Sequence, residues 1–109
     1  MSKTSRTSIT APASAKKDSI IEIRAIAQHD METGFRYTQD GKSIPRDMIR
    51  LFTCRYNNEE VFRSDFYSGI GANPLIIFNT IAIASGTIEC RWIGDDGYEA
   101  LNQVKITVS

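Results

Sequence analysis

The side chains that could do chemistry in this 109-residue chain are few, and they stand far apart along the sequence. His29 is the only histidine, and one imidazole cannot make a zinc site without thiolates or carboxylates. Asp30 and Glu32 follow it closely, so a weak metal site is one interpretation. We prefer a loop histidine that hydrogen-bonds a neighbour or a partner, and we expect no bound metal.

The two cysteines, Cys54 and Cys90, fall at inward-facing positions of two expected strands. Two are too few for a disulfide-dense scaffold, and their spacing is not that of a metal site. In antibody domains a tryptophan lies on a strand between two such cysteines, whereas Trp92 comes two residues after Cys90. We expect buried thiols that pack as small apolar side chains. The sequence leaves open whether they are bonded.

No arrangement of nucleophile and base suggests an enzyme. Serines are frequent, but none lies in a Gly-x-Ser-x-Gly turn, and there is no glycine-rich phosphate loop. Asp95 and Asp96 form a carboxylate pair, yet Asp-Asp-Gly after a strand is typical of a turn. We expect a non-catalytic chain without catalytic residues or a cofactor.

One long segment, 29–46, combines residue types that are common at protein interfaces. Its glycines and proline interrupt any regular pattern, and loops of this length are usually functional or disordered. Methionine and arginine are enriched at interfaces, and a loop on a rigid scaffold is a frequent recognition site. An ordinary loop that covers a sheet edge explains the pattern equally well. The residues that we predict to dock a partner are His29, Met31, Glu32, Arg36, Ile44, Pro45 and Arg46.

Charge and hydropathy argue against two classes of partner. Thirteen basic residues balance thirteen acidic ones, whereas nucleic-acid binders carry an excess of Lys and Arg. No apolar stretch approaches the roughly 18 residues of a membrane span. Residues 1–18 are polar and lack the apolar region of a secretory signal. We expect binding neither to nucleic acid nor to a membrane.

Period-two alternation predicts strands in most of the chain. From Ile20, apolar side chains alternate with Glu22 and Arg24, and further runs cover 48–56, 61–67, 87–93 and 104–108. The run 75–84 is rich in Ile and Phe, which is typical of a strand buried on both faces. Ser85 and Gly86 after it predict a tight hairpin turn.

Six or seven short strands in about 100 residues are typical of an antiparallel sandwich. We therefore predict an all-β fold, an immunoglobulin-like antiparallel β-sandwich of about seven strands. The chain divides into a flexible N-terminal lead-in over 1–17 and one domain over 18–109. Within the lead-in, Ile9 could begin a short edge strand.

These residues also resemble a known family, the SoxZ proteins of bacterial sulfur oxidation, over about 20–108. The resemblance is carried by the motifs His29-x-Met31-Glu32-Thr33-Gly34-x-Arg36, Asp40-Gly41-Lys42-x-Ile44-Pro45-Arg46, Phe52-x-Cys54, Val61-Phe62, Ala72-Asn73-Pro74 with Phe78, Gly86, and Trp92 followed by Asp95-Asp96-Gly97. The sequence departs from the family at Asp30, at 57–59 and at 75–76.

The resemblance implies a non-catalytic, immunoglobulin-like subunit of a SoxYZ-type sulfur carrier complex in thiosulfate oxidation. Its partner is a SoxY-like protein that carries sulfur intermediates on a cysteine of a mobile arm, and other pathway enzymes act through the complex. The resemblance also implies a periplasmic location, with export on the signal of the partner. Cys54 matches a family cysteine but is not expected to carry cargo.

Two alternatives to this function stay open. One is an independent immunoglobulin-like module that binds protein or carbohydrate, although a carbohydrate site needs exposed aromatic side chains. The other is a small redox or metal protein that uses His29 and the cysteines. The isolated chain could also self-associate into a homo-oligomer.

Overall fold

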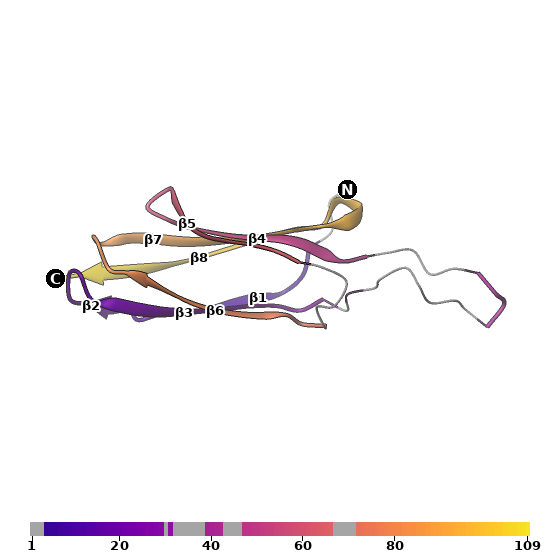
Figure 1. Cartoon of the computed structure of the whole chain (residues 1–109), viewed down its shortest axis with the longest axis horizontal. Helices are drawn as coiled ribbons and strands as arrows, with labels where there is room; N and C mark the ends of the chain where they lie inside the picture. The colour runs from indigo at the N-terminus through magenta and orange to yellow at the C-terminus, as the bar shows by residue number, and fades with distance from the viewer. Residues whose placement is uncertain (1–3, 30, 32–38, 43–46, 67–71) are drawn as a thin grey trace.

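A computed structural model of the chain describes residues 4–29, 31, 39–42, 47–66 and 72–109. Within these residues the chain forms eight strands and one turn of 3-10 helix, arranged in two layers (Figure 1). The elements are β1 (Thr7–Thr10), β2 (Ser14–Ala15), β3 (Ile20–Ala27), β4 (Ile49–Tyr56), β5 (Glu59–Asp65), β6 (Leu75–Ile81), β7 (Gly86–Gly94), η1 (Asp95–Gly97) and β8 (Glu99–Val108). No described helix has the length and apolar character to cross a membrane.

The two layers are a three-stranded sheet in the order β1-β3-β6 and a five-stranded sheet in the order β2-β8-β7-β4-β5. All neighbours are antiparallel except β2 and β8, which run parallel. This arrangement confirms the predicted immunoglobulin-like sandwich. Strands β5 and β6 each end a sheet on the same side of the sandwich, and both therefore have one edge without a neighbouring strand.

The core lies between the layers because each strand directs every second side chain inward. Strand β3 alternates between buried and exposed positions, with Ile21 and Ile23 inward and Glu22 outward. In the opposite sheet, Phe52 and Trp92 are fully buried, with ring centroids 5.2 Å apart. Aromatic pairs at such distances add stability beyond the area that they bury.

Two further phenylalanines close the sandwich between its unpaired edges. The rings of Phe62 on β5 and Phe78 on β6 are stacked, with centroids 4.3 Å apart. Both also approach Phe52, at 6.1 and 6.2 Å. Because β5 and β6 belong to different sheets, this stack holds the two layers together where no strand pairing does.

The turn between β4 and β5 has the geometry that its sequence favours. Asn57 and Asn58 have φ angles of 52° and 68°, and positive φ at both central residues defines the type I′ turn of a two-residue hairpin. The hairpin predicted at Ser85 and Gly86 is wrong. Strand β6 pairs only with β3, and β7 lies between β4 and β8 in the other sheet, so this segment crosses between the layers.

The segment 1–17, expected to be a flexible lead-in, carries strands where the structure describes it. β1 pairs with β3, with Ile9 opposite Ala25, and β2 pairs with β8. Backbone hydrogen bonds also join this segment to β8, such as the one from Thr107 N–H to the carbonyl oxygen of Ala13 at 3.0 Å. These strands could not be recognised from the polar composition, because an edge strand needs few apolar side chains. In this segment Ile9, Ala11 and Ala15 pack against the core.

Candidate functional site

The first candidate region is the base of the 29–46 segment, where a buried histidine faces the residue at which the described chain resumes. The His29 side chain is 8% exposed, and its Nε2 lies 3.5 Å from Oδ1 of Asp47. The His29 ring packs edge-on against Tyr98, with centroids 4.8 Å apart. His29 therefore links the end of β3 to Tyr98, just before β8, and to Asp47, where the described chain resumes after the loop. We call His29, Met31, Asp47, Asp95 and Tyr98 the loop base.

Met31 is the second anchor of the loop base. Its backbone has φ of 58°, which a side-chain-bearing residue adopts at a cost of about 1–2 kcal/mol. Two hydrogen bonds hold it there: its N–H donates to Nδ1 of His29 at 3.0 Å, and its Sδ accepts from Ile49 N–H at 3.3 Å. The Met31 side chain is also buried, with 7% of its surface exposed. Because Nδ1 of His29 accepts, the neutral ring carries its proton on Nε2, directed toward Asp47.

Two further loops join the same end of the sandwich. Asp95 Oδ2 accepts from Met48 N–H at 3.1 Å, and Asp95 N–H donates to the Met48 carbonyl oxygen at 2.8 Å. Asn73 exchanges hydrogen bonds with the backbone of His29, at 2.9 Å through its Oδ1 and 2.7 Å through its N–H. Loops that precede β6 and β8 thus fix the position from which the long segment leaves.

Tyr98 completes the loop base as a neutral phenol. Burial raises its pKa above the ordinary value, Asp47 adds to the rise, and a 2.6 Å hydrogen bond with Ser5 Oγ opposes it. The phenol is therefore not a base at neutral pH. Together the loop base is suited to positioning a loop, since its polar groups are engaged with one another.

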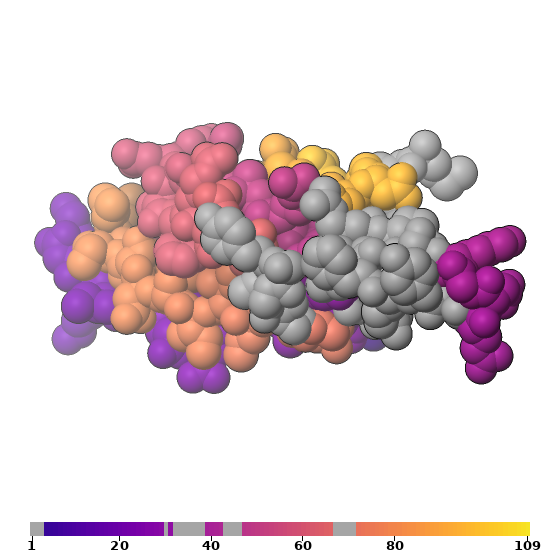
Figure 2. All heavy atoms as spheres, turned by 45° about the vertical axis from the view of Figure 1, so that its right-hand side comes forward, coloured from indigo at the N-terminus to yellow at the C-terminus, as the bar shows by residue number. Residues whose placement is uncertain are grey.

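The predicted docking residues fall into two groups. His29 and Met31 lie in the loop base, where their side chains are buried and act on the loop itself. Glu32, Arg36, Ile44, Pro45 and Arg46 lie outside the described residues, so their docking role stays a prediction. Residues 39–42, in the middle of the segment, are exposed and lie at one end of the molecule, beyond the strands (Figures 1 and 2).

The cysteines lie opposite each other on adjacent strands, in the register Cys54↔Cys90. Both are free thiols with no exposed surface. A hydrogen bond with Cys54 and burial raise the pKa of Cys90 far above that of an ordinary thiol. The same hydrogen bond lowers the pKa of Cys54. A reactive cysteine also needs exposure, so neither buried thiol is placed to react with a soluble molecule. Among the described residues, no group of three His, Cys, Asp or Glu could hold a metal ion.

The second candidate region is the outward side of β3 and β6. Strand β6 was expected to be buried on both faces, but Leu75, Ile77 and Ile81 are 53%, 50% and 42% exposed. The expectation is wrong because, among the described residues, no third layer covers the three-stranded sheet (Figure 1). We call the outward residues of these strands the apolar face: Ile20, Glu22, Arg24, Ile26, Leu75, Ile77, Asn79 and Ile81.

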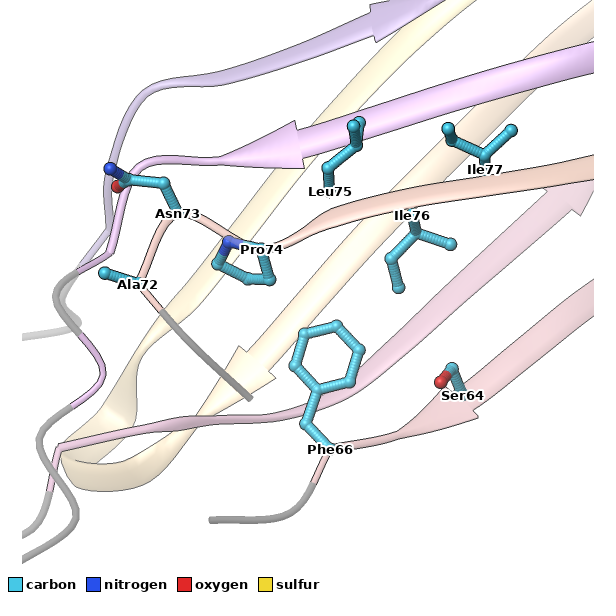
Figure 3. A pocket seen from close by; sticks show the side chains of 8 residues that line it. All are labelled: Ser64, Phe66, Ala72, Asn73, Pro74, Leu75, Ile76 and Ile77. Carbon is cyan, nitrogen blue, oxygen red and sulfur yellow. The ribbon is translucent and has the colours of Figure 1, made fainter. Parts of the chain in front are cut away.

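A groove of about 510 Å³ borders this region at the unpaired edge of β6. It is lined by Ser64 and Phe66 from the end of β5 and by 72–77. The Phe66 ring is directed toward Pro74 and Ile76 across the gap between the sheets (Figure 3). Because Leu75 and Ile77 belong to both features, the groove continues the apolar face around the sheet edge. Sequence analysis missed both, although the alternation of Leu75, Ile77 and Ile81 was a usable signal for one continuous outward surface.

A family model described as "Sulphur oxidation protein SoxZ" matches residues 9–105, which is nearly the whole chain. The chain belongs to the SoxZ family. This match confirms the resemblance found in the sequence and places the chain among the sulfur-oxidation proteins. A search of curated proteins found no match to this SoxZ-family chain.

Solved structures with the same fold include superoxide reductases and a sulfur carrier protein. A superoxide reductase (neelaredoxin) from Ignicoccus hospitalis is 20% identical, with a TM-score of 0.71 over 94% of this chain and 80% of its own. A putative superoxide reductase from Thermotoga maritima is also 20% identical, with a TM-score of 0.66 over 99% and 94%. The sulfur carrier protein SoxY from Chlorobium limicola f thiosulfatophilum is 9% identical, with a TM-score of 0.67 over 98% and 83%. At these identities the likeness concerns the fold.

Proposed function

We propose that this chain is the non-catalytic subunit of a SoxYZ-type sulfur carrier complex in thiosulfate or sulfur oxidation. It binds a cysteine-bearing SoxY-like protein as a heterodimer and helps that partner dock to the other enzymes of the pathway. The family match over 9–105 supports membership in the Sox system. The solved SoxY structure shows that a sulfur carrier of the same system has the same fold.

The observation that carries the proposal is the burial of both thiols. A cargo cysteine must reach several active sites in turn, whereas Cys54 and Cys90 lie inside the sandwich with no exposed surface. The cargo thiol of a carrier complex that contains this chain therefore belongs to the partner. What this chain contributes is a rigid scaffold, a surface for the partner and the long segment that leaves the loop base.

The complex is proposed to act in the periplasm, where this chain arrives with a partner that carries the export signal. Fractionation of cells grown on thiosulfate tests this part separately. The chain is expected in the periplasmic fraction when the SoxY-like protein is present, and it should stay in the cytoplasm when the partner is deleted. Periplasmic protein in the deletion strain contradicts co-export.

The decisive experiment is purification of the tagged chain from cells oxidising thiosulfate, followed by intact-mass analysis of the complex. We expect a SoxY-like partner in a one-to-one ratio, with sulfur adducts on one partner cysteine and an unmodified mass for this chain. Adducts on Cys54 or Cys90 contradict the proposal. A chain that purifies alone favours the independent binding module.

A further inference from the structure

Five large aliphatic side chains are exposed on or just beyond the outward side of the three-stranded sheet. Their exposed fractions are 71% for Ile20, 53% for Leu75, 50% for Ile77, 42% for Ile81 and 55% for Ile83. Single exposed aliphatic residues are normal on any protein, but contiguous groups mark interaction sites.

Strand register divides this group into two clusters, one on each side of the Glu22–Asn79 pair. Ile20 lies directly opposite Ile81, Arg24 opposite Ile77, and Ile26 opposite Leu75. Residues in such pairs have Cβ atoms about 4.5–5.5 Å apart, so their side chains touch across the strands. The eight residues of β3 and the two-strand width of β3 and β6 give the apolar face a plan of about 26 by 10 Å. The groove at the β6 edge extends this surface toward the size of a stable interface.

The charges on the apolar face neutralise each other. Arg24 Nε donates to Glu22 Oε1 at 2.7 Å, and the two side chains are 54% and 50% exposed. The surface that fits here is consequently apolar and carries no net charge. Within the described residues only Nε of Arg24 is engaged, so its outer guanidinium nitrogens remain available to an acceptor on the opposing surface.

The opposite outer face, on the five-stranded sheet, has a different chemistry. Its rows pair Arg55 with Glu89, and Arg63 with Thr53 and Arg91. The exposed aliphatic residue Leu101 lies beside Arg91 and is 51% exposed. Interspersed charges of both signs are typical of a solvated surface, which leaves the apolar face as the stronger candidate for an interface.

We propose that the apolar face packs against the outer sheet face of the SoxY-like partner, and this inference rests on the proposed function. SoxY of Chlorobium limicola f thiosulfatophilum has the same sandwich fold, so such a partner offers a sheet of similar twist. Two sheet faces pack at about 10 Å with strands within about 30° of each other. The partner sheet supplies aliphatic side chains and an acceptor for Arg24.

A second copy of this chain fits the face less well. The carboxylate that a second copy would offer to Arg24 is Glu22, which already accepts from its own Arg24. A symmetric dimer would remove two Arg24–Glu22 ion pairs from water instead of one, and such desolvation is costly.

The test compares Ile77→Lys with the matched control Leu101→Lys, using full-length chain and the SoxY-like protein of the same organism. The two residues have equal exposure on opposite faces. Calorimetric titration should show a dissociation constant raised at least about 30-fold by Ile77→Lys and changed less than about 3-fold by Leu101→Lys. Circular dichroism checks that each variant folds. Should Ile77→Lys fail to fold, Ile20→Lys takes its place, because Ile20 is the most exposed of the group.

Each outcome bears on a different statement. Tight binding by the wild type with equal affinities for both variants overturns the face assignment and leaves the proposed function standing. Stronger loss from Leu101→Lys also overturns it, in favour of the five-stranded sheet. Absence of binding by the wild type overturns the proposed function and this occupant together. A wild-type homodimer that Ile77→Lys makes monomeric, and that the partner does not dissociate, assigns the face to a second copy instead.

Discussion

The loop base lies beyond the end of β3, whereas β3 and β6 form the apolar face, and the two regions differ in how far their side chains are covered. At the loop base, His29 and Asp47 face each other, and the contacts of Met31 are made within the chain. On the apolar face, Ile20 and Ile77 present half or more of their surface to solvent. The loop base therefore stabilises the fold and positions a loop, whereas the apolar face exposes aliphatic side chains to solvent. Substitutions should separate the two, through stability in one case and binding in the other.

The largest loss of stability is expected from Gly94→Ala, at the end of β7 beside the loop base. A Cβ there would lie 2.5 Å from the Met48 carbonyl oxygen and 3.1 Å from Ile49 Cα, so the backbone must shift. Overpacking of this kind costs about 2–3 kcal/mol, which lowers the melting temperature by roughly 10–20 °C. Urea unfolding measures it. Gly41→Ala is the comparison, because a Cβ at Gly41 meets nothing within 4 Å and the change should cost only the strain of its φ of 82°, about 1 kcal/mol. Equal effects at the two glycines would contradict the role of this close approach.

His29→Ala should lower the free energy of unfolding by about 2 kcal/mol. The change removes the ring contact with Tyr98 and the nitrogen that accepts from Met31 N–H. Met31 N–H, which lies near the core, is then left without its hydrogen bond. His29→Gln restores a side-chain acceptor and should recover part of the loss. If the loop base only positions the segment, affinity for the partner falls less than it does in Ile77→Lys. A normal unfolding curve for His29→Ala speaks against the loop base as an anchor.

Tyr98→Phe tests the pH dependence of the loop base. Removal of the hydrogen bond to Ser5 should cost about 1 kcal/mol at neutral pH. Because the fold raises the pKa of Tyr98, the folded state binds the phenolic proton more tightly than the unfolded state. The stabilisation is complete below about pH 10 and is lost as pH rises through the folded-state pKa. Tyr98→Phe should therefore lose less stability than the wild type between pH 9 and 11, whereas Ser5→Ala removes the hydrogen bond that lowers the pKa of Tyr98 and should lose at least as much as the wild type.

The smallest effect on stability is expected from Ile77→Lys itself. Its side chain is half exposed on the outward side of β6, so the change should alter the free energy of unfolding by less than about 0.5 kcal/mol. Urea unfolding of the isolated chain measures the free energy of unfolding of this variant, which is then compared with its loss of affinity for the partner. A loss of stability as large as that from His29→Ala would mean that Ile77 belongs to the core, and the separation between the two regions would fail.

Much of the fold could be predicted from alternation and turn chemistry. Cys54 and Cys90 were placed inward from their neighbours in the pattern, and both are buried. Asn57 and Asn58 have the positive φ that asparagine tolerates, so the turn between β4 and β5 follows from its own residues. These features depend on contacts between residues close in sequence or on the two-residue period of a strand, which a single sequence displays directly.

The candidate site was harder to predict. His29 and Met31 were interpreted as docking residues of a loop, but their partners at Asp47, Ile49 and Tyr98 are supplied by other strands. Periodicity does not reveal which distant residues a side chain will meet. It therefore could not tell a buried anchor from an exposed contact.

By itself, the sequence determined that this chain forms strands with one apolar side each, and that its thiols point into a core. It also determined the family, through motifs that follow one another along most of the chain. Only the tertiary structure decided which of the apolar strands are covered. Strand β6 has apolar residues on both sides, and such a pattern is the same whether a third layer is present or absent. The described strands form two layers, so Phe78 is buried while Ile77 is exposed to solvent.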